Sequence, residues 1–108
     1  MKRAVFIFLV LTITGPVLAS GNPDNGKNKA AQVCAACHGP DGNKPSAPDQ
    51  PILAGQHYDY LVRALTDYKI GRRNNPIMKG FAAQLSKQDI EDLSAWFASQ
   101  KSALHDQR

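Results

Sequence analysis

Both cysteines of the chain lie in one short run, CAACH, between Cys34 and His38. Two intervening residues let both thiols lie near the same helical face within one turn. A disulfide between them would close a very short loop and add little stability. It would also leave the adjacent histidine without a role. The run therefore favours a fold in which the two thiols and the adjacent histidine form a binding site.

Two other interpretations of this run agree poorly with the rest of the chain. A thioredoxin-like redox pair needs a strand that leads into the motif in a βαβ context, whereas here the motif ends a helical pattern. A structural zinc site needs four ligands. Beyond the run, the chain offers only His57 and His105, which are far apart in the sequence and unpaired.

The pattern C-x-x-C-H is the specific signature of covalent haem c attachment. Each thiol can add across a haem vinyl group to form a thioether, and the next residue then lies beneath the ring. The imidazole of His38 can bind iron through Nε2 while Nδ1–H donates to a backbone carbonyl. The sequence predicts one haem c, attached to Cys34 and Cys37, with His38 as the proximal iron ligand.

The N-terminus is typical of a secretory signal peptide. Lys2 and Arg3 precede an apolar run over residues 4–13, and the sequence VLA that ends at Ala19 suits signal peptidase. The apolar run is about half of the roughly 20 residues that a membrane span needs. We expect cleavage of residues 1–19, which leaves residues 20–108 as one exported domain.

Charge and length exclude several classes of function. The net charge of +4 includes two cations of the signal segment, which leaves +2 for the exported domain. So small a charge gives no electrostatic footprint for nucleic acid. No cysteine lies near the cleavage site to carry a lipoprotein anchor, so we expect a soluble periplasmic protein without membrane insertion. A domain of this size has a small core, which a cofactor can complete.

Hydrophobic periodicity predicts an all-α protein with three main helices and two long loops. Gly71 marks the end of the second helix, and the S-x-x-D cap at Ser86 marks the start of the third. No convincing alternating strand pattern occurs. The helices are predicted at residues 22–37, 56–69 and 86–102, and the loops at residues 39–51 and 71–85.

The second axial position of the iron decides what the haem can do. A closed position favours electron transfer, and an open one favours ligand binding or catalysis. Met78 is the methionine that remains after cleavage, and it lies 40 residues after His38 on the second predicted loop. The rival ligands, His57 and His105, are more typical of solvated surface histidines. The sequence therefore favours Met78 as the second axial ligand.

With these residues placed, the chain resembles class I c-type cytochromes. Among them it is most similar to small bacterial cytochromes such as cytochrome c553 or a single domain of cytochrome c4, over essentially the whole exported domain. The resemblance implies the cytochrome c fold, with helices and loops wrapped around one haem. It rests on the segments CAACHGPDGN at 34–43, PILAGQHYDYL at 51–61, DYKIGRRNNPIM at 67–78 and LSKQDIEDLSAWFASQ at 85–100.

The resemblance assigns further residues to the haem pocket. Pro51 is similar to the family proline whose carbonyl accepts a hydrogen bond from the proximal histidine. Leu53 and Leu61 are similar to residues that line the pocket. In related sequences a tyrosine and an arginine near the end of the second helix lie close to the haem propionates. The residues implied at that place are Tyr68, Arg72 and Arg73.

The resemblance also explains why the first helix has so few bulky side chains. Gly26 and Ala30 match the small positions at which the N-terminal helix of the family crosses the C-terminal helix. Trp96 and Phe97 would then fill the crossing from the other side.

Together these features predict a periplasmic monohaem electron carrier rather than an enzyme. Its partners would be a periplasmic or membrane-bound dehydrogenase, a cytochrome bc1-type complex, or a terminal oxidase or reductase. Two alternatives remain open at this stage. One is a small-ligand sensor or peroxidase-like enzyme in which Met78 leaves the iron. The other is an electron-transfer subunit of a larger oxidoreductase.

Overall fold

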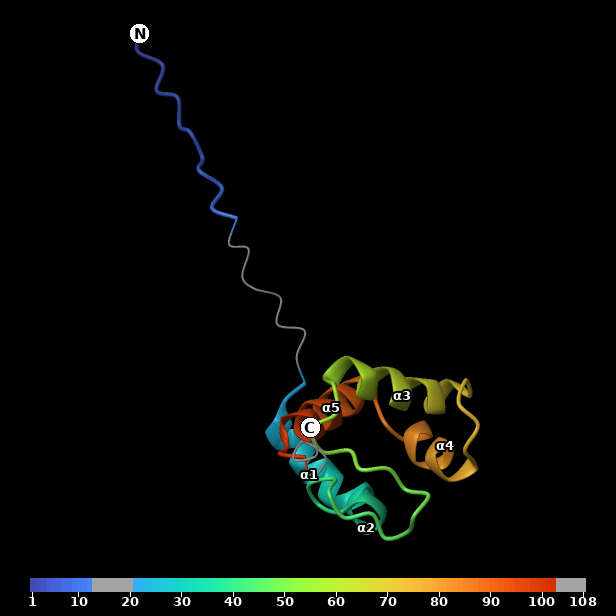
Figure 1. The fold of residues 1–108 in the computed structure, drawn as a ribbon. Coiled ribbons are helices and arrows are strands. Elements are labelled where there is room, and N and C mark those ends of the chain that lie inside the picture. Colours follow the sequence, from blue (N-terminus) through green and yellow to red (C-terminus); the bar gives the residue numbers. More distant parts are fainter. Residues whose placement is uncertain (13–20, 103–108) are drawn as a thin grey trace.

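A computed structural model of the chain describes residues 1–12 and 21–102. Residues 1–12 have no regular secondary structure and lie away from the helical body (Figure 1). The expected cleavage site and His105 fall outside the described residues. No described helix has the length and apolar character needed to cross a membrane.

All regular secondary structure in the described residues is helical, as the sequence predicts. In Figure 1, α1 and α5 lie side by side, with α3 above them and α4 beside the end of α3. The elements are α1 (Pro23–Val33), α2 (Ala35–His38), α3 (Tyr58–Ile70), α4 (Pro76–Ala83) and α5 (Lys87–Ser99).

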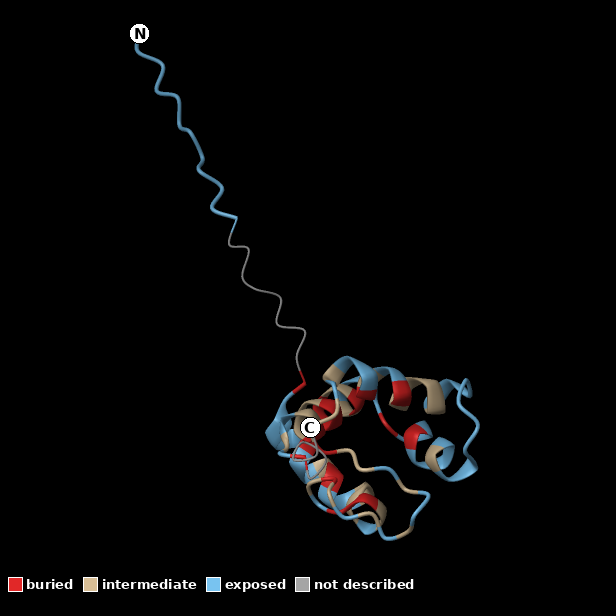
Figure 2. Ribbon diagram, viewed as in Figure 1, coloured by how far each residue is buried: buried red, intermediate tan, exposed pale blue. Residues whose placement is uncertain are grey.

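The core forms where α1, α3 and α5 meet, and the buried residues gather there in Figure 2. Small side chains on α1 allow α5 to approach, while α5 supplies the bulk. This arrangement agrees with the small first-helix positions noted in the sequence. The buried apolar cluster consists of Ala30, Leu61, Leu85, Ile90, Leu93 and Phe97.

Gly26 is the point of closest approach between α1 and α5. A Cβ atom at this position would lie 2.0 Å from the backbone oxygen of Asp92 and 2.9 Å from the Cβ of Trp96. The Asp92 carboxylate, which is buried, also accepts a 2.7 Å hydrogen bond from the N–H of Asn22 at the start of α1. The two helices are therefore held together at backbone distance, and no side chain can separate them.

The prediction of a second loop over residues 71–85 is wrong in part, because α4 lies within this range. The sequence Asn-Asn-Pro, taken as a sign of a loop, begins this helix. The side chain of Asn75 accepts hydrogen bonds from the N–H groups of Ile77 and Met78, both at 3.1 Å, and Pro76 occupies the first turn. Met78 therefore lies on a helix rather than on a loop.

The remaining boundaries agree with the sequence apart from two smaller differences. The first predicted helix is interrupted at Cys34, which separates α1 from α2. The helix α3 ends at Gly71, whose φ of 85° is the left-handed conformation that glycine adopts readily. The helix α5 begins at Ser86 as predicted but ends at Ser99 rather than near Ser102. Gln100 already has an extended backbone, with ψ of 144°.

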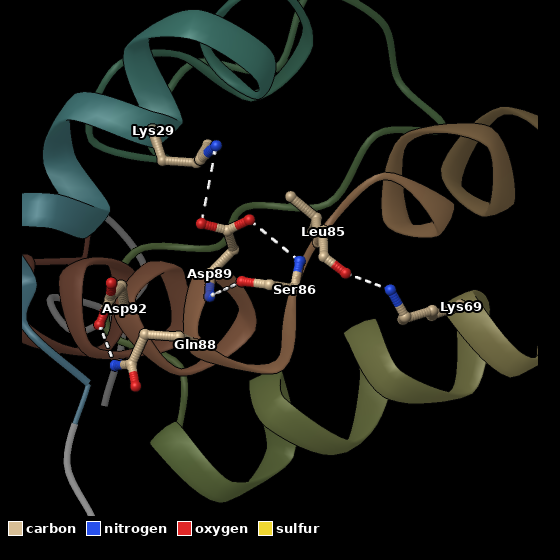
Figure 3. A network of polar contacts seen from close by, with 7 residues as sticks. All are labelled: Lys29, Lys69, Leu85, Ser86, Gln88, Asp89 and Asp92. Atoms are coloured by element: carbon tan, nitrogen blue, oxygen red, sulfur yellow. Dashed lines mark hydrogen bonds and ion pairs between the residues drawn. The ribbon is translucent and has the colours of Figure 1, made fainter.

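Polar contacts from α1 and α3 converge on the start of α5 and the residue before it (Figure 3). Ser86 and Asp89 form a reciprocal capping box, with hydrogen bonds of 2.9 and 3.0 Å. Lys29 of α1 lies 3.6 Å from the Asp89 carboxylate. Lys69 of α3 donates to the carbonyl of Leu85, just after α4. This corner links α4 to α3 and fixes where α5 begins.

We predict opposite effects for the same substitution at two helical glycines. Gly26→Ala should destabilise the fold by about 1–3 kcal/mol, because its methyl group meets backbone atoms of α5. Gly80→Ala, on α4, should stabilise it by about 0.5–1 kcal/mol, because nothing outside the backbone of its own helix lies within 4 Å of the added carbon. Chemical denaturation of the purified protein measures both. Equal effects would contradict the close contact at Gly26.

The capping box predicts a pH-dependent contribution to stability. Hydrogen bonds from Ser86, helped by Lys29, lower the pKa of Asp89. Its stabilising effect is therefore complete above the unfolded-state pKa of about 4 and is lost as the pH falls through the lower folded-state pKa. Asp89→Asn should cost about 0.5–1 kcal/mol at pH 7 and nothing at the acid end of this range.

Unfolding by urea between pH 2 and pH 7 tests this dependence. Glu91→Gln is the matched control, since it makes the same carboxylate-to-amide change on the same helix outside the capping box. A cost of Asp89→Asn that stays constant with pH would show that the charge of Asp89 is not involved.

Candidate cofactor site

A cavity of about 370 Å³ opens between the cysteine-containing segment, the loop that follows it, and helices α3, α4 and α5. Its size is within the range of cofactor and ligand pockets. Most of its wall is aliphatic or aromatic, and the polar groups are few. The larger apolar side chains in the wall include Leu53, Leu61, Leu65, Phe81, Leu85 and Phe97.

Cys34 and Cys37 line one wall of this cavity, and neither forms a disulfide. Cys34 follows α1 and precedes the single turn of α2, so the chain winds both thiols to the cavity side within one turn. Burial raises the pKa of the Cys34 thiol to about 11, and the nearby Cys37 adds to this rise. At neutral pH the Cys34 thiol of the apoprotein therefore keeps its proton.

His38 ends α2 and is buried, with 5% of its surface exposed. Its Nδ1 lies 2.9 Å from the carbonyl oxygen of Pro51. A carbonyl can only accept, so this contact places the ring proton on Nδ1 and leaves the lone pair on Nε2. The ring also lines the cavity. His38 is thus held in the tautomer that a metal ligand bound through Nε2 requires.

The loop from Gly39 to Pro51 is folded so that it presents the Pro51 carbonyl to His38. The N–H of Ser46 donates to the carbonyl of Cys37 at 2.9 Å. The side-chain oxygen of Gln50 accepts three hydrogen bonds from Ser46 and Ala47, between 2.8 and 3.0 Å. These contacts give the turn-rich stretch a defined shape, as expected for a long loop that wraps a site.

The loop and the short segment that follows it are each attached to α5. The indole Nε1 of Trp96 donates to the carbonyl of Pro40 at 3.0 Å, and the N–H of Gly55 donates to the carbonyl of Phe97 at 2.9 Å. The loop therefore takes its position from the same helix that packs against α1.

Met78 reaches the cavity from α4 and is half-buried. In Figure 1, α4 lies apart from α2, so the methionine and the cysteine-histidine segment belong to different walls. Ile77 and Phe81 are neighbours on the same helix, line the cavity and remain exposed in part. The cavity thus brings a thioether and an imidazole together from segments 40 residues apart.

The structure places nine of the ten residues proposed from the sequence in the cavity wall, and Arg72 is the exception. Arg72 is exposed and does not line the cavity, whereas Arg73 does and lies over the ring of Tyr68, 4.7 Å from its centroid. The rival ligand His57 is exposed at the start of α3, outside the wall. The nine residues in the wall are Cys34, Cys37, His38, Pro51, Leu53, Leu61, Tyr68, Arg73 and Met78.

Sequence reasoning missed several residues of the wall. Tyr60 and Leu65 lie on α3, on or near its apolar face, and that pattern could have identified them. Phe81 was missed because α4 was not recognised as a helix. Ser94 gave no signal, since a serine on a helix is usually interpreted as solvated.

Comparison with known proteins identifies the family. Residues 23–101 match the cytochrome c family. The chain belongs to the cytochrome c family. Members of this family carry covalently bound haem c with iron, and Cys34 and Cys37 fit its C-x-x-C-H motif. The class I resemblance stated from the sequence is confirmed.

The most informative relatives are bacterial cytochromes. The chain is 48% identical over 100 residues to cytochrome c4 of Pseudomonas aeruginosa, covering 93% of this chain and 49% of that protein. It is 38% identical over 85 residues to cytochrome c-554(548) of Halomonas halodenitrificans, covering 76% of this chain and 100% of the relative. This cytochrome c therefore spans about half the length of the cytochrome c4 that it matches.

A solved structure supports the same fold. Reduced recombinant cytochrome c4 from Pseudomonas stutzeri superposes with a TM-score of 0.71 at 43% identity, covering 78% of this chain and 48% of the other. The expected cytochrome c fold is thus confirmed. The correction at α4 concerns one local element and leaves this fold unchanged.

The residues of this cytochrome c fit a covalently held haem. Two free thiols, one imidazole with a fixed tautomer and one thioether face a largely apolar cavity. Thiols in the wall can form thioether bonds to a haem. The imidazole of histidine and the side-chain sulfur of methionine are both known haem-iron ligands. We expect Cys34 and Cys37 to hold the haem and His38 and Met78 to be available to the iron.

We predict that the two cysteines contribute separately to attachment. Cys34→Ala and Cys37→Ala, each made alone, should retain haem through one thioether and shift the pyridine haemochrome band to longer wavelength, because one vinyl group stays conjugated with the ring. The double variant should lose all haem on a denaturing gel stained for haem. Retention of covalent haem by the double variant would exclude both thiols as attachment points.

Proposed function

We propose that this protein is an exported electron carrier whose single haem c is bound by Cys34 and Cys37 and ligated by His38 and Met78. One observation carries the proposal: a single, largely apolar cavity has all four of these side chains in its wall. No cluster of three or more His, Cys, Asp or Glu side chains among the described residues has the arrangement of a metal-ion site built from such residues alone.

His38 and Pro51 would set the proximal side of the site. The 2.9 Å contact from Nδ1 to the Pro51 carbonyl orients the ring and increases the electron donation from Nε2. Because the loop that holds Pro51 is attached to α5, the same hydrogen bond would orient the ring in both charge states of the iron. A ligand that does not need to move suits repeated electron transfer.

Met78 would close the distal side. It lies in the first turn of α4, where Asn75 accepts hydrogen bonds from two backbone N–H groups and holds the turn in place. A thioether ligand favours the reduced state of iron. When bound, haem supplies reversible one-electron exchange between ferric and ferrous iron.

The apolar wall would keep water away from the site. Tyr68 and Arg73 stack on one another and both line the cavity. We propose that they interact with the haem propionates, with Arg73 rather than Arg72 as the cation, since only Arg73 lines the cavity.

The place of action is also part of the proposal. The cationic and apolar N-terminal residues support cleavage after Ala19 and export of residues 20–108 to the periplasm. The partners would be redox proteins such as a dehydrogenase, a cytochrome bc1-type complex, or a terminal oxidase or reductase. The cytochrome c4 relatives support a carrier without catalytic residues of its own.

We predict that Met78→Ala opens the distal side. The oxidised protein should lose the weak far-red absorption band that sulfur-to-iron coordination produces. The ferrous variant should bind carbon monoxide, which the unaltered protein should exclude, and its reduction potential should fall. Absorption spectra, gas titration and redox titration measure these three effects.

Two control variants separate ligand loss from general damage. Ile77→Ala changes the preceding residue of α4 and should keep the far-red band. His57→Ala removes the rival histidine and should also keep it, since His57 is exposed outside the cavity wall. A ligand sensor or peroxidase-like enzyme would instead bind carbon monoxide without any substitution. A far-red band that survives Met78→Ala would overturn the assignment of Met78.

A further inference from the structure

Ser94 is the one buried side-chain polar group in the described residues that has no hydrogen-bond partner. It lies on α5 with 0% of its surface exposed. The other buried polar side chains of the described residues have partners: His38 contacts Pro51, Asp92 accepts from Asn22 and Gln88, and Ser102 also has one. A buried hydroxyl without a partner loses its hydration without compensation.

The position of Ser94 puts its buried hydroxyl in the cavity wall. It stands next to Leu93 on the face of α5 that lines the cavity, with Phe97 three residues further on. Alanine would fit this place on a helix without the cost of desolvating a hydroxyl. The Ser94 hydroxyl is thus a polar group in an otherwise apolar part of the cavity wall, and the chain itself provides nothing for it to bind.

We propose that Ser94 lowers the reduction potential of the haem by placing a rotatable hydroxyl dipole against it. The inference rests on the proposed function, because it takes the cavity to be the haem site. The oxidised haem core carries one more positive charge than the reduced core, since reduction adds one electron and removes no bond. A hydroxyl that can turn its oxygen toward this charge stabilises the oxidised form more than the reduced form.

The surroundings of Ser94 make this dipole effective. The neighbouring wall residues Leu93, Phe97 and Leu85 are all buried and apolar, so little solvent screens the hydroxyl. Arg73, which lines the cavity and is exposed, carries a charge that is present whatever residue occupies position 94. The polarity of the wall is one of the means by which a protein sets the potential of its haem.

Two matched pairs of variants, made in the full chain with haem attached, test the proposal. Ser94→Ala removes the hydroxyl. Ser94→Thr keeps it, and Ser94→Val has the shape of threonine without it. Redox titration should give a higher midpoint potential for Ser94→Ala than for the unaltered protein, and a higher one for Ser94→Val than for Ser94→Thr. Both shifts should exceed the reproducibility of the titration.

The outcomes can be told apart. Equal potentials within each pair would overturn the proposal. If the larger Thr and Val side chains prevent haem attachment, the Ser and Ala pair still decides. Retention of the far-red band in every variant keeps this test separate from that of the proposed function, which fails if the unaltered protein lacks the band.

Discussion

The backbone contact between α1 and α5 at Gly26 is the constraint on which the other elements depend. Because the two helices touch there without an intervening side chain, α5 has one position relative to the segment that carries both cysteines and His38. The loop before α3 is attached to α5 through Trp96 and Gly55. The Pro51 carbonyl and the ring of His38 therefore meet as a consequence of how α1 and α5 cross.

The two sides of the cavity are held by different contacts. Hydrogen bonds along the loop hold one side, and a short helix with its own N-terminal cap forms the other. The proximal side is built from α1, α2 and the loop, and hydrogen bonds hold it from Cys37 to Pro51. The distal side is α4, a short helix with its own cap at Asn75 that contacts mainly α3. In the proposed site, the hold of Met78 on the iron would depend on how firmly α4 is positioned. Lys69, near the end of α3, donates to the carbonyl of Leu85 just after α4 and helps to position it.

Much of the fold could be predicted from the sequence because its signals are local. The stripe of small residues on the first helix, Gly71 after the second and the Ser86 cap before the third each act within a few residues. The helix α4 escaped because Asn-Asn-Pro is ambiguous: the same residues that end regular structure also begin a helix, as Asn75 and Pro76 do here. The two capping hydrogen bonds of Asn75, which only the structure shows, identify this sequence as the start of a helix.

By itself, the sequence determined the chemistry of the site, since the CAACH run and a methionine 40 residues later specify which side chains could hold a haem. The tertiary structure decided which of these residues share a cavity. It separated Arg73 from Arg72, excluded His57 from the wall and placed a buried hydroxyl, that of Ser94, inside it. The physical reason is that residue type is encoded locally, whereas burial and orientation depend on how distant helices pack.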